Sequence, residues 1–303
     1  MSQSYVAATS NEWRPRTQLR KWLSRAFLVW CIAAVSIGII LLAVLIIDVA
    51  IDGAARLFDF PTFFNLDFMT NFASRFPGRA GIWAAIIGTL YMMVITAAIA
   101  FPIGIGAAVY LEEYARRSRF LSLIQLNINN LAGVPSIVYG LLGLQLFVRG
   151  LEFDRSVLAG ALTMAMLVMP IIIVSAQESL RAVPPSMREG AYALGATRWQ
   201  VVRRGVLPFA VGGMMTGNIL AMSRAIGETA PLIMIGALTF IAFLPKDPLD
   251  SFTVLPIQIF NWISRPQDEF QVVAAAGILV LLLMLLVMNS VAIIVRQRSR
   301  VEW

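Results

Sequence analysis

Six long apolar stretches constrain this chain more than any other feature. They lie at roughly 26–47, 82–110, 120–148, 157–176, 209–238 and 271–295. Each approaches or exceeds the ~20 residues that an α-helix needs to cross the hydrocarbon core of a bilayer. The hydrophobic content of 59% and the charged content of 14% agree, because few soluble folds bury that much apolar surface. The pattern predicts an all-α membrane protein with six transmembrane helices.

The distribution of basic residues predicts the orientation. With six spans, both termini lie on one face of the membrane, together with the 177–207 loop. That face carries more basic residues than the other, so the positive-inside rule places it in the cytoplasm. The net charge of +7 could also indicate nucleic-acid binding, but the chain has no basic soluble domain to carry such a fold, and we expect none. The sixteen basic residues assigned inside are Arg14, Arg16, Arg20, Lys21, Arg25, Arg116, Arg117, Arg119, Arg181, Arg188, Arg198, Arg203, Arg204, Arg296, Arg298 and Arg300, and the seven outside are Arg56, Arg75, Arg79, Arg149, Arg155, Lys246 and Arg265.

We divide the chain into a cytoplasmic basic segment at 1–25, a first span with its outer segment at 26–79, and a main bundle at 80–303. The first span could be a secretory signal, but its apolar run exceeds the usual 7–15 residues. Cys31 lies in this span and is interpreted as a packing residue. With one cysteine and no histidine, neither an internal disulfide nor a metal site is expected.

The third and fifth stretches contain residues that distort or pack helices. Gly133 and Pro135 interrupt the third, and a proline leaves a carbonyl unpaired, so backbone at this depth must face protein or a wet cavity. A kink for packing and a pathway lining are both compatible with this pattern. The fifth contains Gly213 and Gly217 at the spacing of closely packed membrane helices.

The polar segment between the fourth and fifth stretches predicts two short helices. Ser186 and Glu189 have the spacing of a capping box, and Gly195 can end that helix in a left-handed turn. Thr197 can cap a second helix that runs to Pro208. An apolar stripe at Met187, Ala191 and Leu194 would either meet a partner or lie on the membrane or the chain's own bundle.

This segment resembles the EAA loop of type I ABC-importer permeases. Gly190 departs from the family's usual alanine, and Gly205 from its frequent isoleucine. The resemblance implies that the 177–208 loop docks on a separate ATPase. The chain has no G-x-x-x-x-G-K-[ST] phosphate loop, so ATP and Mg are expected on that partner, with no cofactor and no catalysis on this chain. The expected coupling residues are Glu189, Gly190, Ala191, Gly195, Leu207 and Pro208.

An arginine and a glutamate lie four residues apart within the fifth stretch. Arg224 and Glu228 would share one helix face in the middle of the span and could pair. Placing an arginine at the centre of a membrane helix costs about 2.5–3.5 kcal/mol on insertion scales. The presence of Arg224 therefore indicates either a structural ion pair or a functional site. As a functional site, the guanidinium fork suits phosphate or carboxylate oxygens, and Glu228 would keep binding weak enough for release.

The segments 224–232 and 133–140 resemble permeases of phosphate ABC importers, with an ending at 230–232 similar to the PstA-type subunit. The resemblance implies a MetI-like bundle at 80–303 in the bacterial inner membrane, and a pathway formed by Arg224, Glu228, Ser223 and Thr229. It also implies as partners a PstC-type permease, a PstB-type ATPase dimer and an external PstS-type phosphate-binding protein.

Two alternatives of function stay open at this point. The chain could serve an importer of another oxyanion, such as phosphonate or sulfate, because an arginine fork does not distinguish them. It could also be a proton-driven secondary carrier with Glu228 as the proton site. An intramembrane enzyme is not expected, because without histidine only Ser/Lys pairs remain, and Lys21 and Lys246 are poorly placed for them.

Overall fold

The structure is a computed structural model that describes residues 17–58, 65–116, 118–237 and 240–298. Residues 1–16 of the expected basic segment and 59–64 of the expected outer segment lie outside the described residues. The chain divides into two units, one up to Asp48 and one from Val49 onward. The helices are α1 Thr17–Leu57, α2 Leu66–Thr70, η1 Pro77–Arg79, α3 Trp83–Val109, η2 Tyr110–Tyr114, α4 Arg119–Leu131, α5 Ser136–Gly143, η3 Leu144–Gly150, α6 Val157–Arg181, α7 Pro185–Ala193, α8 Arg198–Val201, η4 Val202–Val206, α9 Leu207–Gly227, α10 Ala230–Ile235, α11 Leu255–Ile263 and α12 Glu269–Arg298.

Five helical runs in the described part of the chain are long and apolar enough to cross a membrane. A sixth span exists only if the bent pair α4 and α5–η3 is counted as one. The prediction of an all-α membrane protein is confirmed, and the count of six depends on that bent pair. The five runs are Arg20–Leu57, Trp83–Tyr114, Val157–Arg181, Arg198–Gly227 and Glu269–Arg298.

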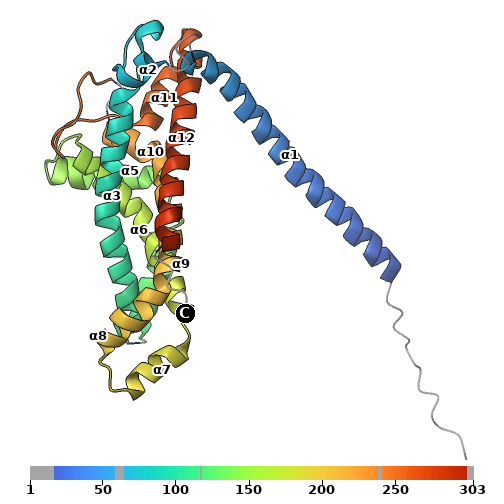
Figure 1. Cartoon of the computed structure of the whole chain (residues 1–303), viewed down its shortest axis with the longest axis vertical. Helices are drawn as coiled ribbons and strands as arrows, with labels where there is room; N and C mark the ends of the chain where they lie inside the picture. The colour runs from blue at the N-terminus through green and yellow to red at the C-terminus, as the bar shows by residue number, and fades with distance from the viewer. Residues whose placement is uncertain (1–16, 59–64, 117, 238–239, 299–303) are drawn as a thin grey trace, which may run out of the picture. The chain divides into compact units, whose positions relative to one another are not determined.

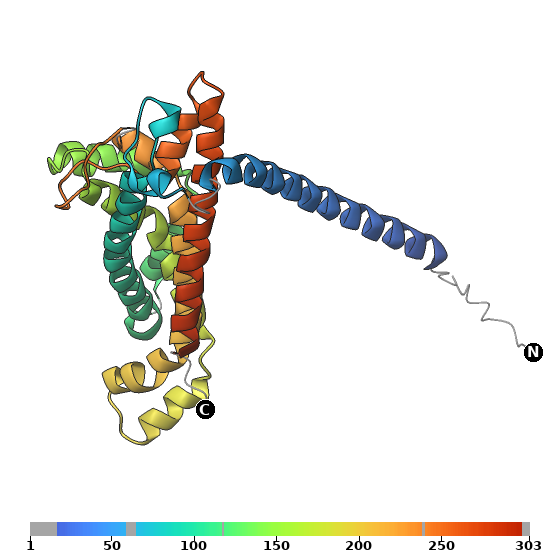
Figure 2. The same cartoon turned by 45° about the horizontal axis from the view of Figure 1, so that its top comes forward.

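Helix α6 forms the centre of the main unit, with α3 and α9 packed against it. Figure 1 shows α3, α6, α9 and α12 running along the bundle, with α7 and α8 together at one end; the turned view in Figure 2 keeps this arrangement. The expected close approach of α9 is confirmed at Gly213, where an added Cβ would lie 2.5 Å from the Ser179 Oγ of α6. At Gly217 the same construction overlaps Ser175. Small residues therefore set the spacing of α6 and α9.

The third predicted span, 120–148, is not straight. Its two halves meet at an angle of 103°, because Pro135 cannot donate a backbone hydrogen bond and disfavours helix in the residue before it. The Tyr139 hydroxyl donates to the Leu131 carbonyl across the bend, at 2.9 Å. Gly140 packs on α10, where an added Cβ would lie 2.6 Å from the Pro231 Cα. Tyr139 and Gly140 are thus buried after the bend, whereas Gly133 and Pro135 at the bend itself are exposed on this chain.

The fifth predicted span, 209–238, is interrupted as well. Helix α9 ends at Gly227, and Glu228 has extended backbone angles, φ −77° and ψ 120°. Pro231 lacks the N–H that would have bonded to the carbonyl of Gly227, so an uninterrupted helix would leave that acceptor unpaired. The short helix α10 follows the break and ends at Gly236, with φ +85°. Residue 238 lies outside the described residues.

Candidate functional site

The first helix of the polar loop begins differently from the prediction. Helix α7 starts at Pro185, with Pro184 at the N-cap and no side-chain cap bond. The expected capping box of Ser186 and Glu189 is therefore wrong. Proline is favoured in the first turn, where its missing N–H has no helical partner, so the Pro184-Pro185 pair starts the helix before Ser186 can act as its cap.

The turn after α7 is as predicted. Gly195 has φ +79°, its N–H donates to the Tyr192 carbonyl at 2.9 Å, and the Ala196 N–H donates to the Ala191 carbonyl at 3.1 Å. This is the Schellman arrangement that a glycine in the left-handed region allows. Thr197 then caps α8 and forms a capping box with Gln200.

The helix that Thr197 begins does not end at Pro208. It continues through η4 and α9 as one run, Arg198–Gly227. The π-helical turn Val202–Val206 precedes Pro208, and the Leu207 N–H donates to the Val202 carbonyl. Such a turn shifts the backbone pairing by one residue and so accommodates the proline within the helix.

The six expected coupling residues lie on both sides of this turn. Glu189, Gly190 and Gly195 are exposed, and Ala191, Leu207 and Pro208 are half-buried. An added Cβ at Gly190 meets nothing within 4 Å, so the departure from alanine there leaves open space.

The predicted apolar stripe is only partly presented to solvent. Met187 and Ala191 pack on the core formed by Val201, Val206 and Ala210, which agrees with the alternative that this stripe packs on the chain's own bundle. Leu194 is 91% exposed. Tyr192 and Trp199 are exposed as well, so the loop carries large apolar side chains that this chain does not cover.

Two acidic residues that pair with arginines of the loop region were not predicted from the sequence. Glu112 and Glu113 lie in η2, at the end of α3, and pair with Arg181 and Arg188 respectively. Their signal in the sequence is an acidic pair at the end of an apolar run, on the face where basic residues prevail.

Arg224 and Glu228 are paired, but at the end of α9 and not in the middle of a helix. The Arg224 Nε lies 3.3 Å from the Glu228 Oε1, and the side chains are 48% and 19% exposed. Among the described residues the terminal Nη atoms of Arg224 have no recorded hydrogen-bond partner. The arrangement leaves most of the guanidinium fork available to an anion.

Ser223 and Thr229, the flanking candidates, lie apart from this pair's contacts. The Ser223 hydroxyl lies 2.5 Å from the Asn289 Oδ1 of α12, so it is engaged on another side of α9. Thr229 is half-buried in the break between α9 and α10, where its carbonyl accepts from the Ile233 N–H.

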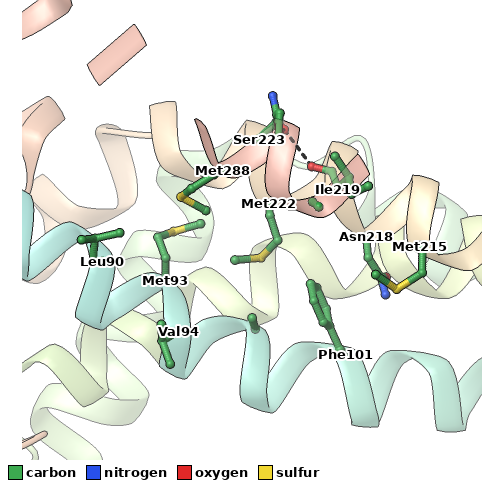
Figure 3. Close-up of a pocket in the computed structure, with 13 residues that line it drawn as sticks. Leu90, Met93, Val94, Phe101, Met215, Asn218, Ile219, Met222, Ser223 and Met288 are labelled. Carbon is green, nitrogen blue, oxygen red and sulfur yellow. Dashed lines mark hydrogen bonds between the residues drawn. The ribbon is translucent and has the colours of Figure 1, made fainter. Parts of the chain in front are cut away.

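Two cavities border α9. One of about 320 Å³ lies between α3, α9 and α12, and Figure 3 shows its methionine-rich lining, which includes Met93, Met222 and Met288 but not Arg224. The other, of about 520 Å³, is lined by Ser175, Glu178, Gly217, Leu220 and residues of α4. Because Gly217, Leu220 and Arg224 are spaced by three and four residues, this second cavity follows the face of α9 that carries Arg224. Within the described residues no group of His, Cys, Asp and Glu is arranged to hold a metal ion.

Sequence comparisons identify the relatives of this chain. Residues 100–300 match the family described as "Binding-protein-dependent transport system inner membrane component". The phosphate transport system permease protein PstA 1 of Mycobacterium tuberculosis is 32% identical over 71% of this chain and 70% of its own. PstA of Yersinia pestis is 34% identical over 72% and 69%. A probable ABC transporter permease of Bacillus subtilis, YqgI, is 30% identical over 75% and 82%.

Solved structures of ABC importers share the fold. A chain of the MetNI methionine transporter superposes with a TM-score of 0.60 at 16% identity, over 72% of this chain and 97% of that one. A chain of a bacterial alginate transporter, in complex with its alginate-bound periplasmic protein, gives 0.64 at 16% identity, over 90% and 93%. The expected MetI-like architecture is confirmed.

Proposed function

The chain belongs to the family of binding-protein-dependent transport system inner membrane components, as a PstA-type permease, and from this premise we propose that it is a pathway-forming subunit of an ATP-driven importer of inorganic phosphate. In this role it hydrolyses no ATP itself. It receives the motion of a separate ATPase through the 177–208 loop.

One observation carries the proposal. The run Arg198–Gly227 is a single helical segment that begins at the Thr197 cap in the loop and ends beside Arg224 and Glu228. At 1.5 Å per residue such a run is roughly 45 Å long. A displacement of the loop therefore reaches the charged pair through continuous backbone.

The charged pair suits a transported anion better than a fixed structural bridge. Arg224 is about half exposed and contributes its Nε to Glu228, so its terminal nitrogens can bind two phosphate oxygens at once. Glu228 competes for the guanidinium and repels the anion, which favours release. The 520 Å³ cavity on the same face of α9 offers space along the route.

The remaining parts of the machine belong to other chains. We place ATP and Mg on a PstB-type ATPase dimer, the second half of the pathway on a PstC-type permease, and substrate delivery on an external PstS-type protein. The loop and both termini then face the cytoplasm from the bacterial inner membrane.

The test is uptake of labelled phosphate into vesicles that hold the complete complex, with wild type compared to Arg224→Gln. The proposal expects ATP-dependent uptake in wild type, and its loss in the variant while the complex and its basal ATPase activity persist. Unchanged uptake in Arg224→Gln would reduce the pair to a structural bridge. Competition by sulfate or phosphonate in place of phosphate would indicate another oxyanion, and uptake that needs a proton gradient but no ATP would indicate a secondary carrier.

A further inference from the structure

Three consecutive residues at the end of α3 each contact a different arginine of the loop region. Glu112 pairs with Arg181, Glu113 with Arg188, and the Tyr114 ring lies 5.4 Å from the Arg198 guanidinium carbon. The three arginines come from α6, α7 and α8 respectively. The π-helical segment η2 is therefore the place where both helices of the loop attach to a membrane span.

Arg188 makes the most extensive of these contacts. Its Nη2 lies 2.7 Å from the Glu113 Oε1 and 2.9 Å from the Leu180 carbonyl. Its Nη1 donates to the Val183 carbonyl at 2.8 Å, and its Nε lies 3.3 Å from the same carboxylate oxygen of Glu113. One side chain of α7 thus binds η2 and the carboxyl end of α6 together. A lysine could not reproduce this, because it lacks a planar fork of five donors.

The two ion pairs differ in burial. The side chains of Arg188 and Glu113 are 23% and 8% exposed, whereas those of Arg181 and Glu112 are 58% and 18% exposed. A shielded, multiply bonded pair resists separation, while an exposed pair contributes little. Besides the bonds of Arg188, α7 contacts the neighbouring helices through the apolar side chains of Met187 and Ala191, which pack on the core around Val201 and Val206.

We propose that Arg188 and Glu113 form the joint that converts displacement of α7 into movement of α3 and α6. The proposal rests on the coupling role of the loop and assigns the residues that transmit it within the chain. Both act by positioning helices, since neither contacts the Arg224–Glu228 pair. If the joint is weakened, α7 still docks, but its motion is absorbed locally and ATP hydrolysis is no longer matched by transport.

The variants Glu113→Gln and Arg188→Lys test this in the full complex. Glu113→Gln keeps the shape and an acceptor oxygen, and Arg188→Lys keeps the charge without the fork. We expect each variant to lower the amount of phosphate transported per ATP hydrolysed by about tenfold. The reason is that each variant removes a charge-assisted hydrogen bond of the joint, which contributes ~1.5 kcal/mol or more. Co-purification of the ATPase should be unchanged. The double variant Glu113→Gln/Arg188→Lys should lose little more than either single variant, because the residues act as one unit. The matched control is Glu112→Gln, which breaks the exposed pair on the same segment and should retain the wild-type ratio.

A second readout does not depend on phosphate. With Cys31 replaced by serine, spin labels at the exposed positions Ile103 of α3 and Leu286 of α12 report the ATP-dependent change in distance between these helices. If the joint acts as proposed, the ATP-dependent change in distance between the labels is at least halved in Glu113→Gln and unaltered in Glu112→Gln. A wild-type ratio and a wild-type distance change in both joint variants would overturn it. If the distance changes with ATP in wild type but no phosphate is taken up, the phosphate assignment fails while the joint remains tested.

Discussion

At position 224 we expect the shape of the cation to matter as well as its charge. The Arg224 Nε engages Glu228, which leaves the two terminal nitrogens to bind an anion side by side. Lysine has one compact ammonium group, which cannot pair with Glu228 and hold two phosphate oxygens in that geometry. We expect Arg224→Lys to retain less than about a tenth of wild-type uptake, a difference of ~1.4 kcal/mol or more. Uptake of labelled phosphate at matched expression measures this.

The control for this prediction is Arg149→Lys, which makes the same change at an exposed residue of η3 and should leave uptake unaltered. Full activity in Arg224→Lys would show that positive charge alone serves the pathway. The fork would then have no part in recognition.

Gly195 is a second position where we expect a single residue to decide whether the ATPase docks on the loop. Its φ of +79° lies in the left-handed region, which Asp adopts more readily than most L-residues, so backbone strain is the smaller part of the expected effect. A carboxylate here would also stand beside Leu194, on the exposed end of the loop. We expect Gly195→Asp to lose the ATPase in co-purification while the chain still inserts in the membrane.

Gly78→Asp supplies the comparison, because Gly78 also has open space around it but lies in η1, outside the loop. It should retain the ATPase. Normal recovery of the ATPase with Gly195→Asp would contradict the docking role of this turn.

The Arg224–Glu228 pairing and the left-handed turn at Gly195 could be predicted from the sequence, because each residue type is costly in its context, whereas their roles in transport stay predictions. Arg224 and Glu228 are conspicuous because ionised groups are rare within an apolar stretch, and Gly195 because little else fits its turn. Glu112 and Glu113 escaped notice, since acidic residues next to a run of arginines are ordinary at a membrane surface. Only the fold brings Glu113 to Arg188, across 75 positions of sequence.

At the scale of helices, the contact of α9 with α6 depends on missing side chains. An added Cβ at Gly217 would overlap the Ser175 side chain, so Gly217→Ala must push the two helices apart or force a rotamer change. Overpacking of this kind costs about 1–3 kcal/mol. We expect a lower thermal midpoint for the purified chain in detergent, measured by the loss of monodisperse protein on heating.

The matched substitution is Gly190→Ala in α7, where an added Cβ meets nothing within 4 Å. It should be neutral, or stabilise slightly through helix propensity. Equal midpoints for wild type, Gly190→Ala and Gly217→Ala would mean that α6 and α9 are not closely packed in solution.

The helical elements were predictable where length and apolarity suffice, as for α3, α6 and α12. The breaks were not. Glycine and proline at 133–135 predicted an irregular third span. The size of the bend, 103°, depends on the packing of α5 against α10, which the pattern does not give. The same residue type acts in opposite ways at two positions: Pro231 follows the end of α9, whereas Pro208 lies inside a continuous helix, because the π-helical turn η4 precedes it.

For the whole molecule, the decisive prediction concerns which side of the membrane the loop occupies. The basic residues concentrate on the face of the loop, so the positive-inside rule predicts that α7 and α8 are cytoplasmic and that the 246–250 segment is external. An ATPase can act only from the side where ATP is present. Orientation therefore constrains every proposal made for the loop.

In a Cys31→Ser background, a cysteine at Leu249, which is 58% exposed, should react with a membrane-impermeant maleimide in intact spheroplasts. A cysteine at Leu194, which is 91% exposed, should react only after the membrane is permeabilised. Labelling of both after permeabilisation controls for intrinsic reactivity. The reverse pattern would place the loop outside, away from ATP, and would remove both the coupling role and the Arg188–Glu113 joint at once. The predicted pattern would leave Arg224 to be approached by phosphate from the opposite side, which is the geometry that import requires.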